Sequence, residues 1–384
     1  MKVILCARNL NSSNGAGLYT LLLLKELSAS KKISKVVVIG PKKLSSFGNK
    51  VEFVLIKLPN LTFILNELFF ALKCVSKIGN LLKKNKYQLV ITCQPFLIFG
   101  KLDSSLITIF HTFHRSYSRV PAKGDLKLYL AKLFHFFYSY FDFLTIKFSD
   151  RVVFVSKNTL EEASKYYSVY KNKFIHIPTF VNTTEFFPLM HTQKVKIRRK
   201  YGFSEQDRII LFVGRMDPLK GLDNLVEVVK VLNIKNDLKL VIVGEGKLKE
   251  SIINNNFVVY LAMIPHKKMN EIYNMVDLFV LPSYYENSPI TVLEAMSSGV
   301  VILASDVGDV NSLINSSGMI YKVNDKVEFQ TKLLKLISSN AAIKNKMIKK
   351  LKRRAIKMYS SETILKTILG LVLSYSKSRE KSRF

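Results

Sequence analysis

The sequence predicts an α/β fold built from two doubly wound domains, on the basis of three observations. The chain has 384 residues, of which 48% are hydrophobic, and this length suits two domains of roughly 150–200 residues better than one core. Short apolar runs of strand length alternate with longer helical segments in both halves, which is typical of parallel sheets. Glycine-containing loops follow several of these runs, at the strand ends where such sheets bind ligands.

The first half opens with a strand at residues 3–6, a polar loop containing Gly15 and Gly17, and a helix at residues 18–27. Strand, glycine loop and helix form the start of a phosphate-binding unit, but the spacing is not that of a dinucleotide fingerprint. The glycines can equally well do no more than turn the chain. The other strands expected here are residues 35–40, 51–55, 87–93, 106–110, 150–156 and 173–181, and the other helices are residues 62–86, 129–148 and 157–167.

The helix expected at residues 62–86 has an apolar face and a basic face. Lys73, Lys77 and Lys84 fall on one side at helical spacing. A basic face beside an apolar one is typical of a helix lying at a membrane surface. An ordinary surface helix with solvated lysines has the same pattern, so both interpretations stay open.

Two histidines follow the strand at residues 106–110. His111 and His114 form an H-x-x-H pair, but no third ligand is close in sequence, and zinc sites use three or four. His111 at a strand end suits a contact to a sugar or a phosphate better than a metal site.

The second half repeats strand and helix more regularly. The expected domains are residues 1–185 and 201–357, joined by a polar, basic linker at 186–200, with a helix at 358–384 returning to the first domain. The strands expected in the second domain are residues 209–213, 238–243, 258–261, 278–281 and 300–305, and its helices start near residues 222, 267 and 289.

A helix start with a carboxylate beside it follows the strand at residues 278–281. Ser288 is a suitable N-cap and Pro289 a suitable first helical residue. The amides of Ile290 and Thr291 would then point out of the helix N-terminus, where a phosphate can bind. Glu286 lies just before this helix.

Glu294 lies on the same helix, a little over two turns from Glu286. One carboxylate can contact a ligand beyond the helix end while the other contacts a part lying alongside, which suits a diphosphate with a nucleoside at one end and a sugar at the other. Taken alone, the two glutamates favour a simpler interpretation, in which Glu286 is a solvated loop carboxylate and Glu294 a residue of the helix surface. Gly214, Arg215 and Lys220 follow another strand end and can converge on the same site.

Three segments in the second half resemble retaining glycosyltransferase family 4, the group 1 glycosyl transferases of GT-B architecture. LFVGRMDPLKG resembles the family's strand, Gly-Arg and Lys-Gly loop, and LVIVGEG its next strand and turn. VDLFVLPSYYENSPITVLEAM resembles its Glu-x7-Glu segment. The likeness is strong over residues 205–322 and weaker in the first half, through NGAGLY, His111 and DRVVFVSKNT. Thr179 and Phe180 stand where the family commonly has Asn-Gly.

The resemblance implies a hexosyltransferase with two Rossmann-like domains facing a central cleft, and a UDP- or GDP-linked sugar as donor. Arg215 and Lys220 would neutralise the diphosphate and Glu294 would bind the ribose hydroxyls. Glu286 would contact the donor sugar and His111 would bind it from the other domain, so these two are the expected catalytic residues. The remaining positions expected at the nucleotide are Gly15, Gly214, Ser288, Ile290 and Thr291.

The resemblance also implies chemistry without a metal or another cofactor. Departure of a nucleoside diphosphate builds negative charge, which two fixed cations and helix amides can stabilise in place of a divalent ion. No Asp-x-Asp element occurs in the sequence, which agrees with metal independence. In the family's usual mechanism the leaving phosphate helps to deprotonate the acceptor on the same face, so no dedicated general base is needed. The expected acceptor is a glycan or a lipid-linked molecule.

The charge is the feature that this resemblance does not explain. The chain carries 59 basic and 28 acidic residues, a net charge of +31, and residues 1–180 hold +18 of it. Such a field favours nucleic acid, an anionic membrane or phosphorylated substrates. We find no nucleic-acid module, so no nucleic acid partner is expected, although a nucleic-acid-binding protein stays an alternative.

The remaining expectations concern location and a second alternative activity. Three cysteines without metal spacing indicate a reducing cytoplasm, and no run of about 18 apolar residues predicts a membrane span. We therefore expect a cytoplasmic protein, with peripheral binding at the inner face of the cell membrane as one explanation of its charge. A basic bias across a whole proteome would give the same count. A sugar-nucleotide epimerase or phosphorylase of the same architecture also stays open.

Overall fold

The computed structural model describes residues 1–10, 15–44, 47–59, 63–93, 100–117 and 126–381. The chain divides into two compact units, each with its own parallel sheet. Unit 1 comprises Met1–Pro178 with Leu365–Phe384, and unit 2 comprises Thr179–Ile364. The expected α/β class with two doubly wound domains is therefore confirmed.

Unit 1 holds a seven-stranded parallel sheet in the order β3-β2-β1-β4-β5-β6-β7. The order reverses between β1 and β4, which makes this a doubly wound sheet. Its strands are β1 (Lys2–Cys6), β2 (Lys35–Gly40), β3 (Val51–Leu55), β4 (Leu89–Thr92), β5 (Ser105–Phe110), β6 (Arg151–Phe154) and β7 (Phe174–His176). Its helices are α1 (Gly15–Ala29), α2 (Phe63–Lys84), α3 (His114–Tyr117), α4 (Leu126–Phe148), α5 (Lys157–Tyr166) and most of α14 (Ser361–Lys381).

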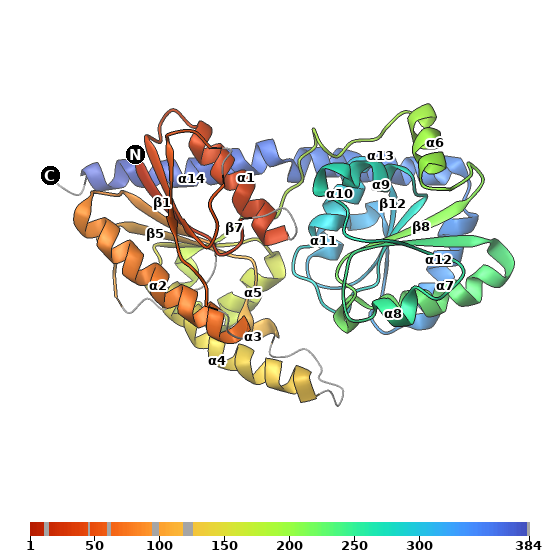
Figure 1. Cartoon of the computed structure of the whole chain (residues 1–384), viewed down its shortest axis with the longest axis horizontal. Helices are drawn as coiled ribbons and strands as arrows, with labels where there is room; N and C mark the ends of the chain where they lie inside the picture. The colour runs from red at the N-terminus through yellow and green to blue at the C-terminus, as the bar shows by residue number, and fades with distance from the viewer. Residues whose placement is uncertain (11–14, 45–46, 60–62, 94–99, 118–125, 382–384) are drawn as a thin grey trace. The chain divides into compact units, whose positions relative to one another are not determined.

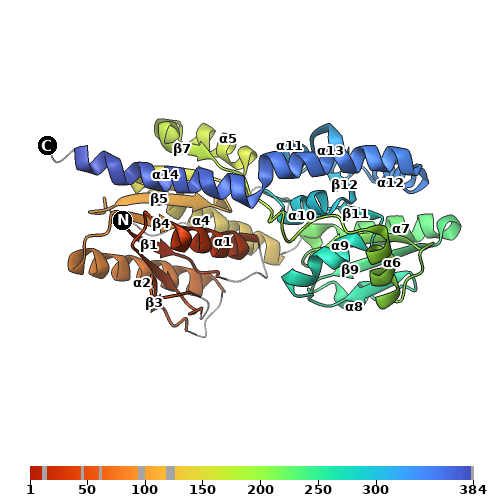
Figure 2. The same ribbon diagram turned by 90° about the horizontal axis from the view of Figure 1, so that it is seen from above.

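Helices cover both faces of this sheet, so its strands are apolar on both sides. α1 and α14 lie on one face, and α2 and α4 on the other (Figure 1). Phe70 and Cys74 of α2 pack with Ile4 of β1 in one core cluster. α14 runs along the sheet near β5 (Figure 2), and the guanidinium of Arg151 lies 5.9 Å from the ring centroid of Tyr375.

Unit 2 holds a six-stranded parallel sheet in the order β10-β9-β8-β11-β12-β13, whose order reverses between β8 and β11. Its strands are β8 (Arg208–Val213), β9 (Leu238–Val243), β10 (Val258–Leu261), β11 (Leu278–Leu281), β12 (Val301–Ser305) and β13 (Met319–Tyr321). Its helices are α6 (His191–Lys200), α7 (Leu222–Asn236), α8 (Lys249–Ile252), α9 (Met269–Asn274), α10 (Ile290–Ser298), α11 (Val310–Ile314), α12 (Lys326–Ser338) and α13 (Ala341–Tyr359).

Two core clusters form on the two faces of the unit 2 sheet. α7 and α12 contribute to one cluster, and α9, α10 and α13 to the other. Alternate residues of β8 explain the division, because Ile210 and Phe212 belong to the first cluster while Ile209 and Leu211 belong to the second.

Residues 186–200, expected to be a linker, are instead packed into unit 2 and contain α6. Asn270 accepts a hydrogen bond from the amide of Phe187 at 3.1 Å, and Asn274 accepts one from the amide of Leu189 at 2.8 Å. The polar, basic composition that suggested a linker includes Arg198, whose side chain is only 11% exposed.

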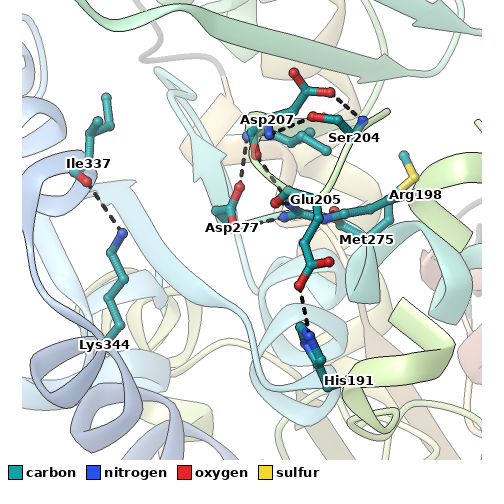
Figure 3. A network of polar contacts seen from close by, with 10 residues as sticks. His191, Arg198, Ser204, Glu205, Asp207, Met275, Asp277, Ile337 and Lys344 are labelled. Carbon is teal, nitrogen blue, oxygen red and sulfur yellow. Dashed lines mark hydrogen bonds and ion pairs between the residues drawn. The ribbon is translucent and has the colours of Figure 1, made fainter. Parts of the chain in front are cut away.

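Arg198 fixes α6 to the amino ends of β8 and β11 (Figure 3). Its guanidinium donates to three backbone carbonyls, those of Met275 at 2.8 Å, Glu205 at 2.8 Å and Asp207 at 3.1 Å. It also pairs with Asp277 Oδ1 at 2.8 Å. This charged side chain can be buried because each of its three guanidinium nitrogens has an acceptor.

Candidate active site

The site residues expected in the second half gather where the unit 2 sheet reverses its strand order. β8 and β11 are neighbours in the sheet, although β9 and β10 separate them in sequence. Gly214 and Arg215 follow β8, and the loop with Glu286 follows β11 and leads into α10. Ligands of doubly wound sheets bind at this position, beyond the carboxyl ends of the strands.

The loop after β8 is held close to the loop after β9. The amide of Gly214 donates to the carbonyl of Val243 at 3.0 Å. Gly244 has φ +142°, and a Cβ there would collide with the carbonyl oxygen of Gly214, so only glycine allows the two loops to approach. Arg215 leaves this loop with a side chain that is 77% exposed and pairs with Asp217 at 3.0 Å.

The loop with Glu286 is clamped at both ends. The amide of Tyr284 donates to the carbonyl of Leu219 at 2.8 Å, and the amide of Asp309 donates to the carbonyl of Asn287 at 2.8 Å. Gly308 has φ +51° and lies so close to the loop that a Cβ would collide with the carbonyl oxygen of Glu286. The position of Glu286 therefore depends on backbone far from it in sequence.

Lys220 and Glu286 form an ion pair at the centre of this site. Lys220 Nζ lies 2.6 Å from Glu286 Oε1, and the hydroxyl of Ser283 donates to the same oxygen at 2.8 Å. The two charged side chains are 20% and 11% exposed. The cation expected at the diphosphate thus contacts the carboxylate expected at the sugar. The contacts from Lys220 and Ser283 are both to Oε1 and not to Oε2.

Helix α10 begins one residue later than the sequence suggested. Pro289 is the N-cap and Ile290 the first helical residue, so Ser288 is not the cap. The hydroxyl of Ser288 is instead 2.5 Å from Thr179 Oγ1. The amides of Ile290 and Thr291 still belong to the first turn, whose amides have no partner within the helix.

Glu294 lies on α10 and is buried, with 3% of the residue exposed. Its Oε1 is 2.7 Å from His266 Nε2, and its Oε2 accepts a hydrogen bond from the hydroxyl of Tyr273 at 2.8 Å. His266 Nδ1 also lies 4.0 Å from Glu185 Oε2. Its role at a ribose stays a prediction.

His266 and Tyr273 are not among the site residues that the sequence predicts. They precede Glu294 by 28 and 21 positions, so no local spacing links them to it. Burial opposes the imidazolium of His266, but the hydrogen bond and charge of Glu294 and the charge of Glu185 together raise its pKa above the usual value. Burial, then Glu294, raises the pKa of Tyr273 well above its usual range, so Tyr273 keeps its proton.

The expected residues of the first half lie in unit 1. Gly15 is the first residue of α1, and His111 follows β5 with its ring centroid 4.8 Å from that of Tyr19. Burial lowers the pKa of His111 to about 4, so its imidazole is neutral at physiological pH. His114 Nδ1 lies 2.9 Å from Asp142 Oδ1. Within the described part of the chain, no group of three His, Cys, Asp or Glu residues could hold a metal.

Family models match both halves of the chain. One described as Glycosyl transferases group 1 matches residues 193–358, and one described as Glycosyltransferase Family 4 matches residues 13–185. Together with the two parallel-sheet units, these matches show that the chain belongs to the glycosyltransferases of GT-B architecture that combine these two families.

The relatives and structures below are proteins to which this chain is similar. An uncharacterized glycosyltransferase of Methanocaldococcus jannaschii is 29% identical over 45% of this chain and 46% of its own. The UDP-Gal:α-D-GlcNAc-diphosphoundecaprenol α-1,3-galactosyltransferase of Escherichia coli is 26% identical over 72% of this chain and 75% of its own. The chain thus spans about half of the first relative and three quarters of the second.

A solved structure shares the fold over nearly the whole chain. The sucrose-phosphate synthase of Thermosynechococcus elongatus has a TM-score of 0.82 at 17% identity, covering 98% of this chain and 99% of its own. At this identity the likeness concerns the fold alone.

Proposed function

We propose that this chain is a retaining glycosyltransferase that moves a sugar from a UDP- or GDP-linked donor to a glycan or lipid-linked acceptor without a metal ion. The observation that carries the proposal is the 2.6 Å contact between Lys220 Nζ and Glu286 Oε1, at the strand-order reversal and just before α10. A cation and a carboxylate are held side by side where a nucleotide would bind.

The diphosphate is assigned to Lys220, Arg215 and the amides of Ile290 and Thr291. Lysine supplies a point charge and arginine a planar pair of donors for phosphate oxygens. The first turn of α10 adds backbone amides and the positive end of the helix dipole. These groups stabilise the negative charge that develops as the nucleoside diphosphate leaves, which is the work that a divalent ion does in other transferases.

The donor sugar is assigned to Glu286 and the ribose to Glu294. Glu286 has one oxygen engaged by Lys220 and Ser283, and its other oxygen is assigned to a sugar hydroxyl. We assign acceptor deprotonation to the leaving phosphate on the same face of the sugar, which gives retention. His111 contributes a neutral imidazole that can hydrogen-bond a sugar hydroxyl without adding charge.

We propose a lipid-linked acceptor at an anionic membrane surface. The relative from Escherichia coli is described as acting on a diphosphoundecaprenol-linked sugar. Helix α2 exposes Leu65 and Leu72, at 47% and 48%, and Lys73 and Lys77 are exposed on the same helix. Among the described helices, none combines the length with the hydropathy of a membrane-spanning segment. An apolar and basic helix face fits reversible binding to acidic lipid.

The test is a donor screen followed by a transfer assay. UDP, GDP and their sugars are tested for protection against thermal unfolding, and transfer is then measured with chelator present. We expect one nucleotide class to protect and transfer to persist in chelator. Loss of transfer that Mg²⁺ or Mn²⁺ restores would reject the metal-free mechanism.

Two single variants with their double variant, one product assay and one binding assay test the remaining parts. Arg215→Ala and Lys220→Ala should each lower transfer at least about 10-fold, because charge-assisted hydrogen bonds are strong. Near wild-type turnover of the folded double variant would contradict this site. Conversion of a sugar nucleotide without acceptor would favour an epimerase or phosphorylase, and salt-dependent binding of random duplex tighter than about micromolar would favour nucleic acid.

A further inference from the structure

A buried carboxylate in unit 2 is held by side chains from two other elements. Glu294 of α10 contacts His266 of the turn η3 (His266–Lys268) and Tyr273 of α9. Glu294 is 3% exposed, and its Tyr273 partner is fully buried. A buried carboxylate is costly unless its charge is compensated and its oxygens are hydrogen-bonded. Here a histidine and a tyrosine meet both requirements.

Each oxygen of the Glu294 carboxylate accepts one hydrogen bond. His266 Nε2 contacts Oε1 and the Tyr273 hydroxyl contacts Oε2. A carboxylate has about four acceptor positions, two on each oxygen. One donor on each oxygen therefore fixes the plane of the carboxylate and leaves one acceptor position on each. Two adjacent hydroxyls, such as the 2′- and 3′-hydroxyls of a ribose, match this pair of positions.

We propose that His266 and Tyr273 are positioning residues for nucleotide recognition, which hold Glu294 so that its two oxygens accept hydrogen bonds from the ribose diol. The proposal rests on the function proposed above, in which Glu294 faces the ribose of a nucleoside diphosphate. Neither residue contacts the nucleotide in this arrangement, since both act through Glu294.

The charge on His266 adds a pH dependence. Glu294 faces His266 from α10, and Glu185 faces it from the segment before α6. The Tyr273 hydroxyl of α9 contacts Glu294, and Lys267 and Lys268 follow His266 on η3. The two carboxylates hold the pKa of His266 above its usual value despite burial. Below that pKa the imidazolium offsets the charge of Glu294. As the pH rises through the pKa of His266, the imidazolium loses its positive charge. Binding of an anionic nucleotide then weakens.

A merely structural role for the three side chains predicts something different. In that case the hydrogen bonds would only join α10 to α9 and η3, and removing one would lower the melting temperature without changing which nucleotides bind. The readout must therefore be the preference for a ribose over a 2′-deoxyribose, because this ratio cancels effects on the diphosphate and the base.

The experiment measures the affinities of UDP and 2′-deoxy-UDP, and of GDP and 2′-deoxy-GDP, by calorimetry. The wild-type protein should prefer the ribonucleotide at least about fivefold, the value of one hydrogen bond. Tyr273→Phe and His266→Gln should lower this preference at least about threefold. Tyr359→Phe is the matched control, since Tyr359 is also a buried tyrosine of unit 2, and its hydroxyl donates to the carbonyl of Ser312 at 3.3 Å. This control should keep the preference.

A pH series provides the second readout. The ratio of wild-type to His266→Gln affinity for the ribonucleotide should fall as the pH rises from about 6 to about 9, through the raised pKa. Because both proteins bind the same nucleotide at each pH, the effect of the nucleotide's own ionisation cancels in this ratio. A ratio that does not change with pH would overturn the role of the His266 charge.

The outcomes separate this inference from the proposed function. If no nucleoside diphosphate binds the wild-type protein, both are overturned. If one binds but 2′-deoxy compounds bind equally well, the inference fails and the donor site stands. If Tyr273→Phe and His266→Gln lower the melting temperature but keep the wild-type preference, the residues are structural and the inference fails.

Discussion

Lys220 Nζ lies 2.6 Å from Glu286 Oε1, so a cation assigned to the diphosphate is neutralised by a carboxylate before any nucleotide binds. Both side chains are mostly buried, at 20% and 11% exposed. A diphosphate must therefore share Lys220 with Glu286 or displace it. The affinity of the site for a nucleotide therefore depends on the charge of Glu286, the carboxylate that we assign to the sugar.

Glu286→Gln should accordingly change binding and turnover in opposite directions. The variant removes a negative charge beside the diphosphate and releases Lys220, so the affinity for UDP or GDP should rise a few-fold. Transfer at saturating donor should fall at least about 10-fold, because charge that develops at the sugar loses its partner. Calorimetry and single-turnover assays measure the two quantities. Weaker nucleotide binding by the variant would contradict the shared role of Lys220.

Gly308→Ala should impair transfer by moving the loop with Glu286. The added Cβ would collide with the carbonyl of Glu286, and misplacement of a catalytic group by about 1 Å can cost on the order of 100-fold in rate. We expect a loss of at least about 10-fold in turnover, measured at saturating donor.

Gly202→Ala is the matched control for this change. Gly202 also has a positive φ, of +83°, but no atom lies within 4 Å of a Cβ there. Backbone strain should cost each variant about 1 kcal/mol of stability, and only Gly308→Ala adds the collision with the loop. Equal turnover of the two variants would show that the position of Gly308 against Glu286 does not matter.

Arg198→Met should destabilise unit 2. The change removes donors from the carbonyls of Met275, Glu205 and Asp207 and leaves Asp277 without its cation. We expect the free energy of unfolding to fall by about 2–4 kcal/mol, measured by urea denaturation followed by circular dichroism. Arg199→Met, at an exposed position on the same helix, should change it by less than about 0.5 kcal/mol. Similar effects of the two substitutions would refute the anchoring role of Arg198.

The basic face of α2 should determine binding to acidic lipid. Changing Lys73, Lys77 and Lys84 together to Glu should abolish sedimentation with acidic vesicles at low salt, because each lysine near such a surface contributes about 1 kcal/mol. The control carries the same charge change on α13, with Lys346, Lys349 and Lys350 changed to Glu at exposed positions. Equal binding of the wild-type protein to neutral and acidic vesicles would rule out the membrane proposal. If only the control variant fails to bind acidic vesicles, the membrane contact lies on α13 and not on α2.

The sequence by itself determined the class of the fold and the positions of most strands. The Val- and Ile-rich runs at β2 and β9 are buried on both faces. Continuous apolar runs are typical of parallel strands, which helices cover on both sides, and such runs can be recognised from local composition alone. The sequence also indicated that Lys220 and Glu286 would converge, since both follow strand ends that must lie on one edge of a parallel sheet.

Only the tertiary structure decided which side chains pair across elements. Ser288 has the chemistry of an N-cap, but Thr179 contacts its hydroxyl, and α10 starts at Ile290 instead. Arg198 belongs to a stretch whose composition predicts a linker. Its side chain is nevertheless buried, because it donates hydrogen bonds to backbone carbonyls of other segments. Glu294 receives both of its donors from residues more than 20 positions away. Strand period and capping preference are local and visible in the sequence, whereas the partners of a buried charge are fixed only when distant segments pack together.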